Sequence, residues 1–172
     1  MSKTNSTITD KLLRGIQSRG LRLKLLTQVG RSIPSEIITC INQVTHNYDS
    51  SSIQARVLTA KIMAAGLAAD GEFECNDTEA WNLASTAWEH ANATNNRDQM
   101  MQRLVRCVGQ KLDLASPHIY SLAVYLINQG HKINFNRLYW DLVHWDDAQG
   151  TVRMAWASSF CQLHDDELQD VA

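Results

Sequence analysis

Residues that interrupt helices are scarce in this sequence. Its 172 residues include only two prolines and eight glycines, which are the poorest helix formers. The stretches between them are rich in Leu, Ala, Gln, Met and Arg, all of which favour helix. The sequence therefore predicts an all-α protein, which we expect to be a compact single-domain bundle of about eight helices.

The sequence also lacks any long apolar run. No stretch of about 18 apolar residues could span a bilayer, and residues 1–20 hold no continuous apolar core of the kind found in signal peptides. We therefore expect a cytoplasmic protein that makes no contact with a membrane. No low-complexity linker divides the chain, so we expect one domain over residues 1–163, followed by a frayed acidic tail over 164–172.

Cysteine and histidine are not arranged as metal ligands. The six histidines form no H-x-x-x-H pair on any predicted helix. The four cysteines lie tens of residues apart without a C-x-x-C pair, which predicts buried, reduced thiols. They are Cys40, Cys75, Cys107 and Cys161. The sequence therefore predicts neither a metal site nor a bound cofactor.

Motifs that mark catalytic sites are absent as well. The chain has no G-x-S-x-G nucleophile elbow, no G-x-x-x-x-G-K-[ST] phosphate loop and no G-x-G-x-x-G dinucleotide fingerprint. His144 follows Asp141 by three residues, a spacing that we interpret as a surface pair rather than an acid–base dyad. We therefore expect a protein that binds other macromolecules and is not an enzyme.

Charge is sorted along the chain, although the net charge is only −2. Residues 1–31 carry seven basic side chains against one acidic, whereas residues 141–172 carry seven acidic side chains against one basic. One interpretation is a solvated basic face and a disordered acidic tail. The other is that the basic N-terminal segment, residues 1–31, contacts nucleic acid or an acidic protein.

Capping residues and breaks divide the chain into the expected helices. Thr9 or Asp10 suits the start of the first helix. Ser116-Pro117 predicts the start of a later helix, and Asn128-Gln129-Gly130 predicts its end. Other boundaries are predicted at Gly30, Pro34, residues 52–69, Asp77 or Thr78, the Asn92–Asn96 turn, Asn134, and Asp146 or Asp147.

Apolar residues at helical spacing predict which helix faces are buried. In the first helical region the stripe includes Leu23 and Leu26. The helix after residue 96 is expected to bury Met101, Leu104, Val105 and Val108, with Arg103 and Arg106 on another side. The five tryptophans lie mostly at such spacing, which predicts core packing rather than base stacking.

Three segments together resemble a known family. Residues 133–145 read INFNRLYWDLVHW and resemble the D-W-x-x-L-x-x-x-L-x-x-W helix of CasB, the small subunit of the type I-E CRISPR surveillance complex Cascade. Residues 152–160, VRMAWASSF, resemble the closing R-x-x-W-A-x-x-F helix of that family, and residues 101–106, MQRLVR, resemble its basic R-x-L-L-R helix. Residues 55–71 are similar to an earlier amphipathic helix, so order and spacing agree over residues 53–163.

The resemblance implies a small helical protein without catalytic activity. Members of the family lie as neighbouring copies along the inner face of the complex, against the repeated backbone subunit that coats the guide RNA. They help to hold the displaced non-target DNA strand. The expected partners are therefore the backbone and large subunits, a neighbouring copy, the CRISPR guide RNA and the target DNA.

Basic residues within the matching segments form the candidate site that the resemblance implies. By position, the nucleic-acid contacts fall on Arg103, Arg106 and Arg137, with Arg97, Arg56 and Lys61 as weaker matches. Arg103 and Arg106 are three residues apart and should share a helix face. Family members are often clearly basic, whereas this chain is slightly acidic, which favours a larger role for protein contacts.

Two other classes of function compete with this interpretation. One is a helical scaffold or adaptor that acts through protein contacts only. The other is a helix-turn-helix regulator or an unrecognised enzyme. A regulator would need several base-reading Arg, Asn or Gln residues on a helix after a tight turn, and no such segment stands out.

Overall fold

A computed structural model describes residues 7–28, 32–70 and 81–162. Within these ranges the chain forms nine α-helices and no strand, which confirms the all-α prediction. The helices are α1 (Ile8–Gln17), α2 (Arg19–Thr27), α3 (Ser35–Thr45), α4 (Ile53–Asp70), α5 (Leu83–Thr94), α6 (Arg97–Val108), α7 (Leu112–Asn128), α8 (Phe135–Val143) and α9 (Thr151–Gln162), with a 3-10 turn, η1 (Ser50–Ser52), before α4.

The chain divides into two compact units, Met1–Phe73 and Glu74–Ala172, each of which is described by itself. The single domain expected over residues 1–163 stays a prediction. The tail expected over 164–172, the Asp77 or Thr78 cap and the Gly30 helix end lie outside the described residues. No helix in the described ranges is both long enough and apolar enough to cross a membrane.

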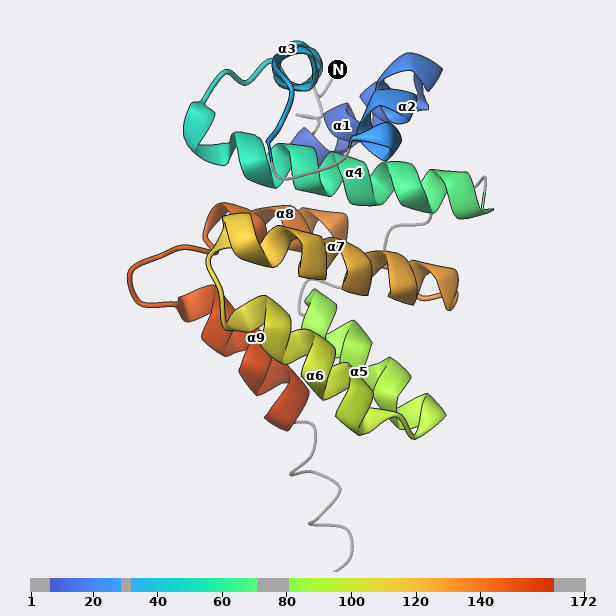
Figure 1. Cartoon of the computed structure of the whole chain (residues 1–172), viewed down its shortest axis with the longest axis vertical. Helices are drawn as coiled ribbons and strands as arrows, with labels where there is room; N and C mark the ends of the chain where they lie inside the picture. The colour runs from blue at the N-terminus through green and yellow to red at the C-terminus, as the bar shows by residue number, and fades with distance from the viewer. Residues whose placement is uncertain (1–6, 29–31, 71–80, 163–172) are drawn as a thin grey trace, which may run out of the picture. The chain divides into compact units, whose positions relative to one another are not determined.

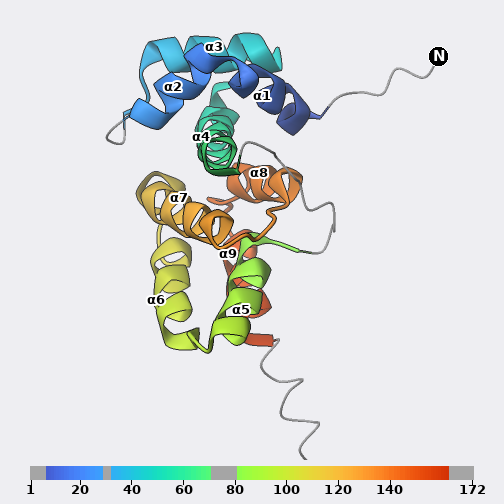
Figure 2. The same cartoon turned by 90° about the vertical axis from the view of Figure 1, so that its right-hand side faces the viewer.

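In the first unit, α1, α2 and α3 all pack against the long helix α4, and α3 crosses it (Figures 1 and 2). The core beside α4 includes the fully buried side chains of Leu12, Ile16, Leu25 and Ile41. Gly15 permits the close approach of α1 to α3, since a Cβ atom there would lie 2.6 Å from Cγ1 of Val44.

The first helical region is broken at Ser18, which sequence reasoning missed. Thr7 caps α1 in a capping box with Asp10, and the extended backbone of Ser18 ends α1 and begins α2. This break resets the helical phase, so α2 buries Leu21 and Leu25. The prediction that Leu23 and Leu26 face inward is wrong, because their side chains are 57% and 36% exposed.

In the second unit, α5 packs against α6, α7 and α9, while α6 also contacts α7 and α9 (Figure 2). The rings of Trp145 and Trp156 are fully buried and meet edge to face, with their centroids 4.8 Å apart. The predicted boundary at Asn134 is confirmed, since Asn134 caps α8 by accepting from the amide of Arg137. The apolar side chains of Phe135, Leu138 and Leu142 on this helix are buried. Trp140, however, is 53% exposed, so core packing does not describe all the tryptophans.

Helix α6 buries Leu104 as predicted, but the rest of its buried face differs from the predicted one. Met100, Leu104 and Cys107 point into the core, whereas Val105 is 55% exposed. Adjacent methionines at 100 and 101 allow two helical phases, and the buried Cys107 thiol belongs to the observed one. Burial raises the pKa of this thiol to about 12, which keeps it protonated. Cys161 was also predicted to be buried, and that prediction is wrong because its side chain is exposed.

Helix α7 begins at Leu112, so the predicted start at Ser116-Pro117 is wrong and Pro117 lies inside the helix. The Leu112 amide donates to both carboxylate oxygens of Asp146, at 3.1 and 3.3 Å. This distant carboxylate satisfies a first-turn N–H that no nearby side chain caps. Asp146 therefore does not begin α9, which starts at Thr151 with its amide donating to Asp147.

Candidate nucleic-acid interface

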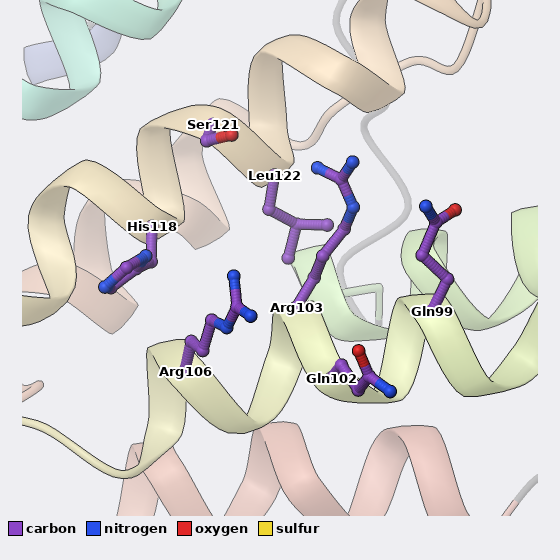
Figure 3. Close-up of a pocket in the computed structure, with 7 residues that line it drawn as sticks. All are labelled: Gln99, Gln102, Arg103, Arg106, His118, Ser121 and Leu122. Carbon is purple, nitrogen blue, oxygen red and sulfur yellow. The ribbon is translucent and has the colours of Figure 1, made fainter.

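A cavity of about 390 Å³ lies between α6 and α7 in the second unit (Figure 3). Two guanidinium groups, an imidazole, two carboxamides and a hydroxyl line it, and none of its seven lining residues is acidic. These residues are Gln99, Gln102, Arg103, Arg106, His118, Ser121 and Leu122. A cavity with cationic and uncharged polar walls suits an anion.

Helical spacing explains why these side chains converge. The α6 residues follow one another at i, i+3, i+4 and i+7 from Gln99, so they form one stripe along the helix. The α7 residues repeat the first part of this spacing from His118. The buried residues of α6 are Met100, Leu104 and Cys107, and each directly follows a cavity residue in the sequence. They therefore lie on the adjacent face of the helix, and the polar stripe faces the cavity.

Arg103 and Arg106 rise from α6 toward α7 (Figure 3). The expectation that the two share a helix face is confirmed, since both line the cavity. The Arg103 guanidinium carbon lies 4.6 Å from the centroid of the Tyr125 ring, a cation–π distance. Arg106 is exposed, and among the described residues no hydrogen bond or ion pair holds its guanidinium.

Arg137 lies on α8, where its Nε donates to Oδ1 of Asp141 at 2.9 Å. Trp156 donates to the other oxygen of the same carboxylate at 2.7 Å. Asp141 is buried, and burial raises the pKa of its carboxyl group while these two donors oppose the rise. The expected surface pair of Asp141 with His144 is therefore wrong, because Asp141 joins α8 to α9 instead.

Arg56 is fully buried beneath the connection between α3 and α4. Its Nη1 donates to Asn42 Oδ1 at 2.9 Å, to Thr45 Oγ1 at 3.2 Å and to the Asn47 carbonyl, and its Nη2 donates to the Asp49 carbonyl. This guanidinium holds the loop together and has no exposed surface for a phosphate.

The two remaining candidates also make internal contacts. Lys61 on α4 donates to the Gln28 carbonyl at 2.9 Å, and burial lowers its pKa. Arg97 donates through Nε to Asn92 Oδ1 at 2.9 Å. Of the six candidates, the structure brings only Arg103 and Arg106 together in one cavity.

Sequence reasoning missed several residues of this site. Gln102, His118, Ser121 and Leu122 line the cavity, and Tyr125 supports Arg103. The shared i, i+3, i+4 spacing on α6 and α7 could have indicated them. Among the residues that the structure places, no three His, Cys, Asp or Glu side chains gather as they would around a metal ion.

Comparisons with known proteins agree on one family. The family model for CRISPR-associated protein Cse2 matches residues 21–160. No curated protein sequence matches the chain significantly. Among solved structures, CasB of M. ruber is 15% identical, with a TM-score of 0.71 over 98% of this chain and 100% of that one.

Two further structures share this fold at low identity. A chain of a CRISPR RNA-guided surveillance complex is 18% identical, with a TM-score of 0.69 over 96% of this chain and 94% of that one. A Cse2-family protein of Thermus thermophilus is 17% identical, with a TM-score of 0.63 over 90% of this chain and 97% of that one. The fold and a family match over residues 21–160 together show that this chain belongs to the CRISPR-associated Cse2 family.

Proposed function

We propose that this protein is the non-catalytic small subunit of a type I-E Cascade complex in the cytoplasm. In that complex it bridges the backbone and large subunits along the guide RNA, next to a neighbouring copy of itself. It also stabilises the non-target DNA strand that target recognition displaces. This proposal depends on one observation: Arg103 and Arg106 line the same cavity, and none of the lining residues is acidic.

The chemistry of the cavity suits a phosphodiester backbone. Guanidinium groups form charge-assisted, often bidentate hydrogen bonds with phosphate oxygens. The glutamine carboxamides and the Ser121 hydroxyl add uncharged donors for the same oxygens. Contacts of this kind carry no base information, as a protein that must accept any target sequence requires.

Modest contacts are sufficient for this role. Opening a DNA duplex against a guide RNA is nearly balanced in free energy, because the heteroduplex formed is about as stable as the duplex lost. A few phosphate contacts to the freed strand therefore shift the balance toward the open state. This also fits a chain whose net charge is only −2.

Replacing both arginines tests the proposal. Target binding by the assembled complex is measured across a salt series for wild type and for R103A/R106A. The slope of log affinity against log salt is negative, and each lost phosphate contact on a single strand reduces its magnitude by about 0.7. We expect the double variant to fold and assemble, to bind all targets more weakly, and to show a slope flatter by about 1 to 1.5.

Two controls share the same helix face. R103K/R106K keeps both charges and should keep most of the salt dependence, whereas Q99A/Q102A removes neutral cavity residues and should leave the slope unchanged. An unchanged slope in R103A/R106A would remove these arginines from the DNA interface and favour a scaffold that acts through protein contacts only. Target cleavage by the purified chain with Mg²⁺, Mn²⁺ or Zn²⁺ would contradict its non-catalytic role.

A further inference from the structure

Behind the cavity, four side chains from three helices and one loop form a continuous chain of contacts. His131, after α7, lies with Nε2 3.0 Å from Nδ1 of His90 on α5. The other ring nitrogen of His90 lies 3.1 Å from the Tyr125 hydroxyl on α7. At the other end of this series of contacts, the Arg103 guanidinium carbon lies over the Tyr125 ring, 4.6 Å from the ring centroid.

The two hydrogen bonds fix Tyr125 from its hydroxyl end. One proton suffices for each hydrogen bond, with Tyr125 donating to His90 and His90 to His131, or with both directions reversed. His90 is only 4% exposed, and burial of its ring lowers its pKa, with His131 adding to this effect, so the neutral form of His90 is favoured. The histidine and tyrosine rings also meet edge to face, at 5.3 Å and 84°.

Tyr125 is not one of the seven lining residues, but its position on α7 places it beside them. It follows His118, Ser121 and Leu122 at i+7, i+4 and i+3, so it lies on the face of α7 that lines the cavity. An arginine normally loses much rotamer freedom when it binds a phosphate. A guanidinium already held on an aromatic face has lost part of that freedom before binding, which increases its affinity.

We propose that Tyr125 is a positioning residue: its ring holds the Arg103 guanidinium ready for a phosphate, and the His90–His131 pair holds the ring. This inference rests on the proposed function, because the ligand is the phosphodiester backbone of the displaced strand. Arg106 has no such aromatic support in the described structure, so the cavity combines one preset arginine with one adaptable arginine.

The test is a double-mutant cycle on target binding by the assembled complex, with wild type, R103A, Y125L and R103A/Y125L. Loss of this partly exposed cation–π contact should weaken binding by Y125L about 2- to 5-fold. In the R103A background the same change should have no further effect, because Tyr125 acts through Arg103. A purely structural role would instead weaken binding equally in both backgrounds, and that result would overturn the inference.

Conservative and matched variants sharpen the cycle. Y125F keeps the ring but loses the hydrogen bond to His90, so its affinity should lie between those of wild type and Y125L. Wild-type affinity in Y125F would show that the histidine pair does not hold the ring, and a loss as large as that of Y125L would show that the ring face is not what positions Arg103. Y120L makes the same change at another half-buried tyrosine of α7, outside the cavity lining, and should leave affinity unchanged.

The failures of the two proposals are distinguishable. If R103A binds target as wild type does, the proposed function loses this site. If R103A is impaired but Y125L binds normally, only the positioning role fails. Should Y125L not assemble, Y125M replaces it in the cycle, and failure of both would show that the fold needs Tyr125 independently of Arg103, which also overturns the inference.

Discussion

Arg56 on α4 and Arg103 on α6 both lie within helices, yet their guanidinium groups meet different surroundings. Arg56 is enclosed by side-chain and carbonyl oxygens of the segment between α3 and α4. Arg103 lies on an aromatic ring at the edge of a cavity with another arginine. The Arg56 guanidinium donates to acceptors within the first unit. The Arg103 guanidinium instead lines a cavity that has room for an acceptor from a ligand.

The difference between these regions depends on the neighbouring segments rather than on the helices themselves. The connection between α3 and α4 folds back so that the carbonyls of Asn47 and Asp49 face α4. In the second region α7 offers Tyr125, Ser121 and His118, none of which can neutralise a guanidinium. A basic residue is therefore a candidate for nucleic-acid binding only when the facing segment leaves its N–H donors without acceptors.

The largest effect should come from removing the enclosed arginine. R56A leaves several buried oxygens without a donor and creates a cavity, so it should lower the free energy of unfolding by about 3 to 5 kcal/mol. Urea denaturation of the full chain measures this change. The exposed R106A is the matched control and should change stability by less than about 0.5 kcal/mol. Equal stability losses in the two variants would contradict the distinction between the two regions.

Arg137 lies between these extremes, since its half-exposed side chain pairs with a buried carboxylate. D141A leaves the buried Trp156 N–H without its acceptor and should cost about 1 to 3 kcal/mol of stability. D141N keeps an acceptor and removes a charge that burial disfavours, so it should cost less than D141A. Thermal unfolding of both variants at neutral pH checks this order, and equal losses would show that the ion pair with Arg137, which both variants remove, dominates.

The smallest effect is a loss of folding stability at acid pH that arises from His90, the residue that contacts Tyr125 behind Arg103. The folded-state pKa of His90 lies below its ordinary value of 6.5, so the unfolded chain binds more protons as pH falls through this range. The contribution of His90 to stability is complete above pH 6.5 and is lost as pH falls through the folded-state pKa. The groups that face it are His131 and Tyr125, with Arg103 beyond the tyrosine ring.

The H90Q variant isolates this dependence. Between neutral pH and about pH 5, wild type should lose more in Tm than H90Q, because glutamine does not titrate and the other histidines are common to both. An equal loss in the two proteins would assign the acid sensitivity to groups other than His90.

Much of the fold could be predicted because local signals agreed with tertiary packing. Asn134 followed by apolar residues at helical spacing predicted α8 correctly, and Asn128-Gln129-Gly130 predicted the end of α7, where Gly130 has a φ of +82°. The errors occurred where a local choice was ambiguous. On α6 two adjacent methionines fit two helical phases, and only contact with α7 and α9 selects one.

The candidate site was predictable only in part for the same reason. The shared face of Arg103 and Arg106 follows from their spacing, so it was found. The enclosure of Arg56 depends on carbonyl groups seven and nine residues earlier, which carry no side-chain signal. The Tyr125 platform and the His90–His131 pair depend on contacts across α5, α6 and α7, whose spacing in the chain follows no local pattern.

The capping of α7 by Asp146 has a consequence for the order in which this protein folds. The acceptor for the Leu112 amide is 34 residues away, so it is absent until the segment after α8 has reached α7. Before then the local preferences of the chain favour a shorter helix that starts near Pro117, as the sequence alone suggests. The first turn of α7 should therefore form late, and pulse-labelling hydrogen exchange during refolding should protect the Leu112 amide only after the amides of the α7 centre. Protection of the Leu112 amide should therefore report the time at which the segment that contains Asp146 packs against α7 during folding.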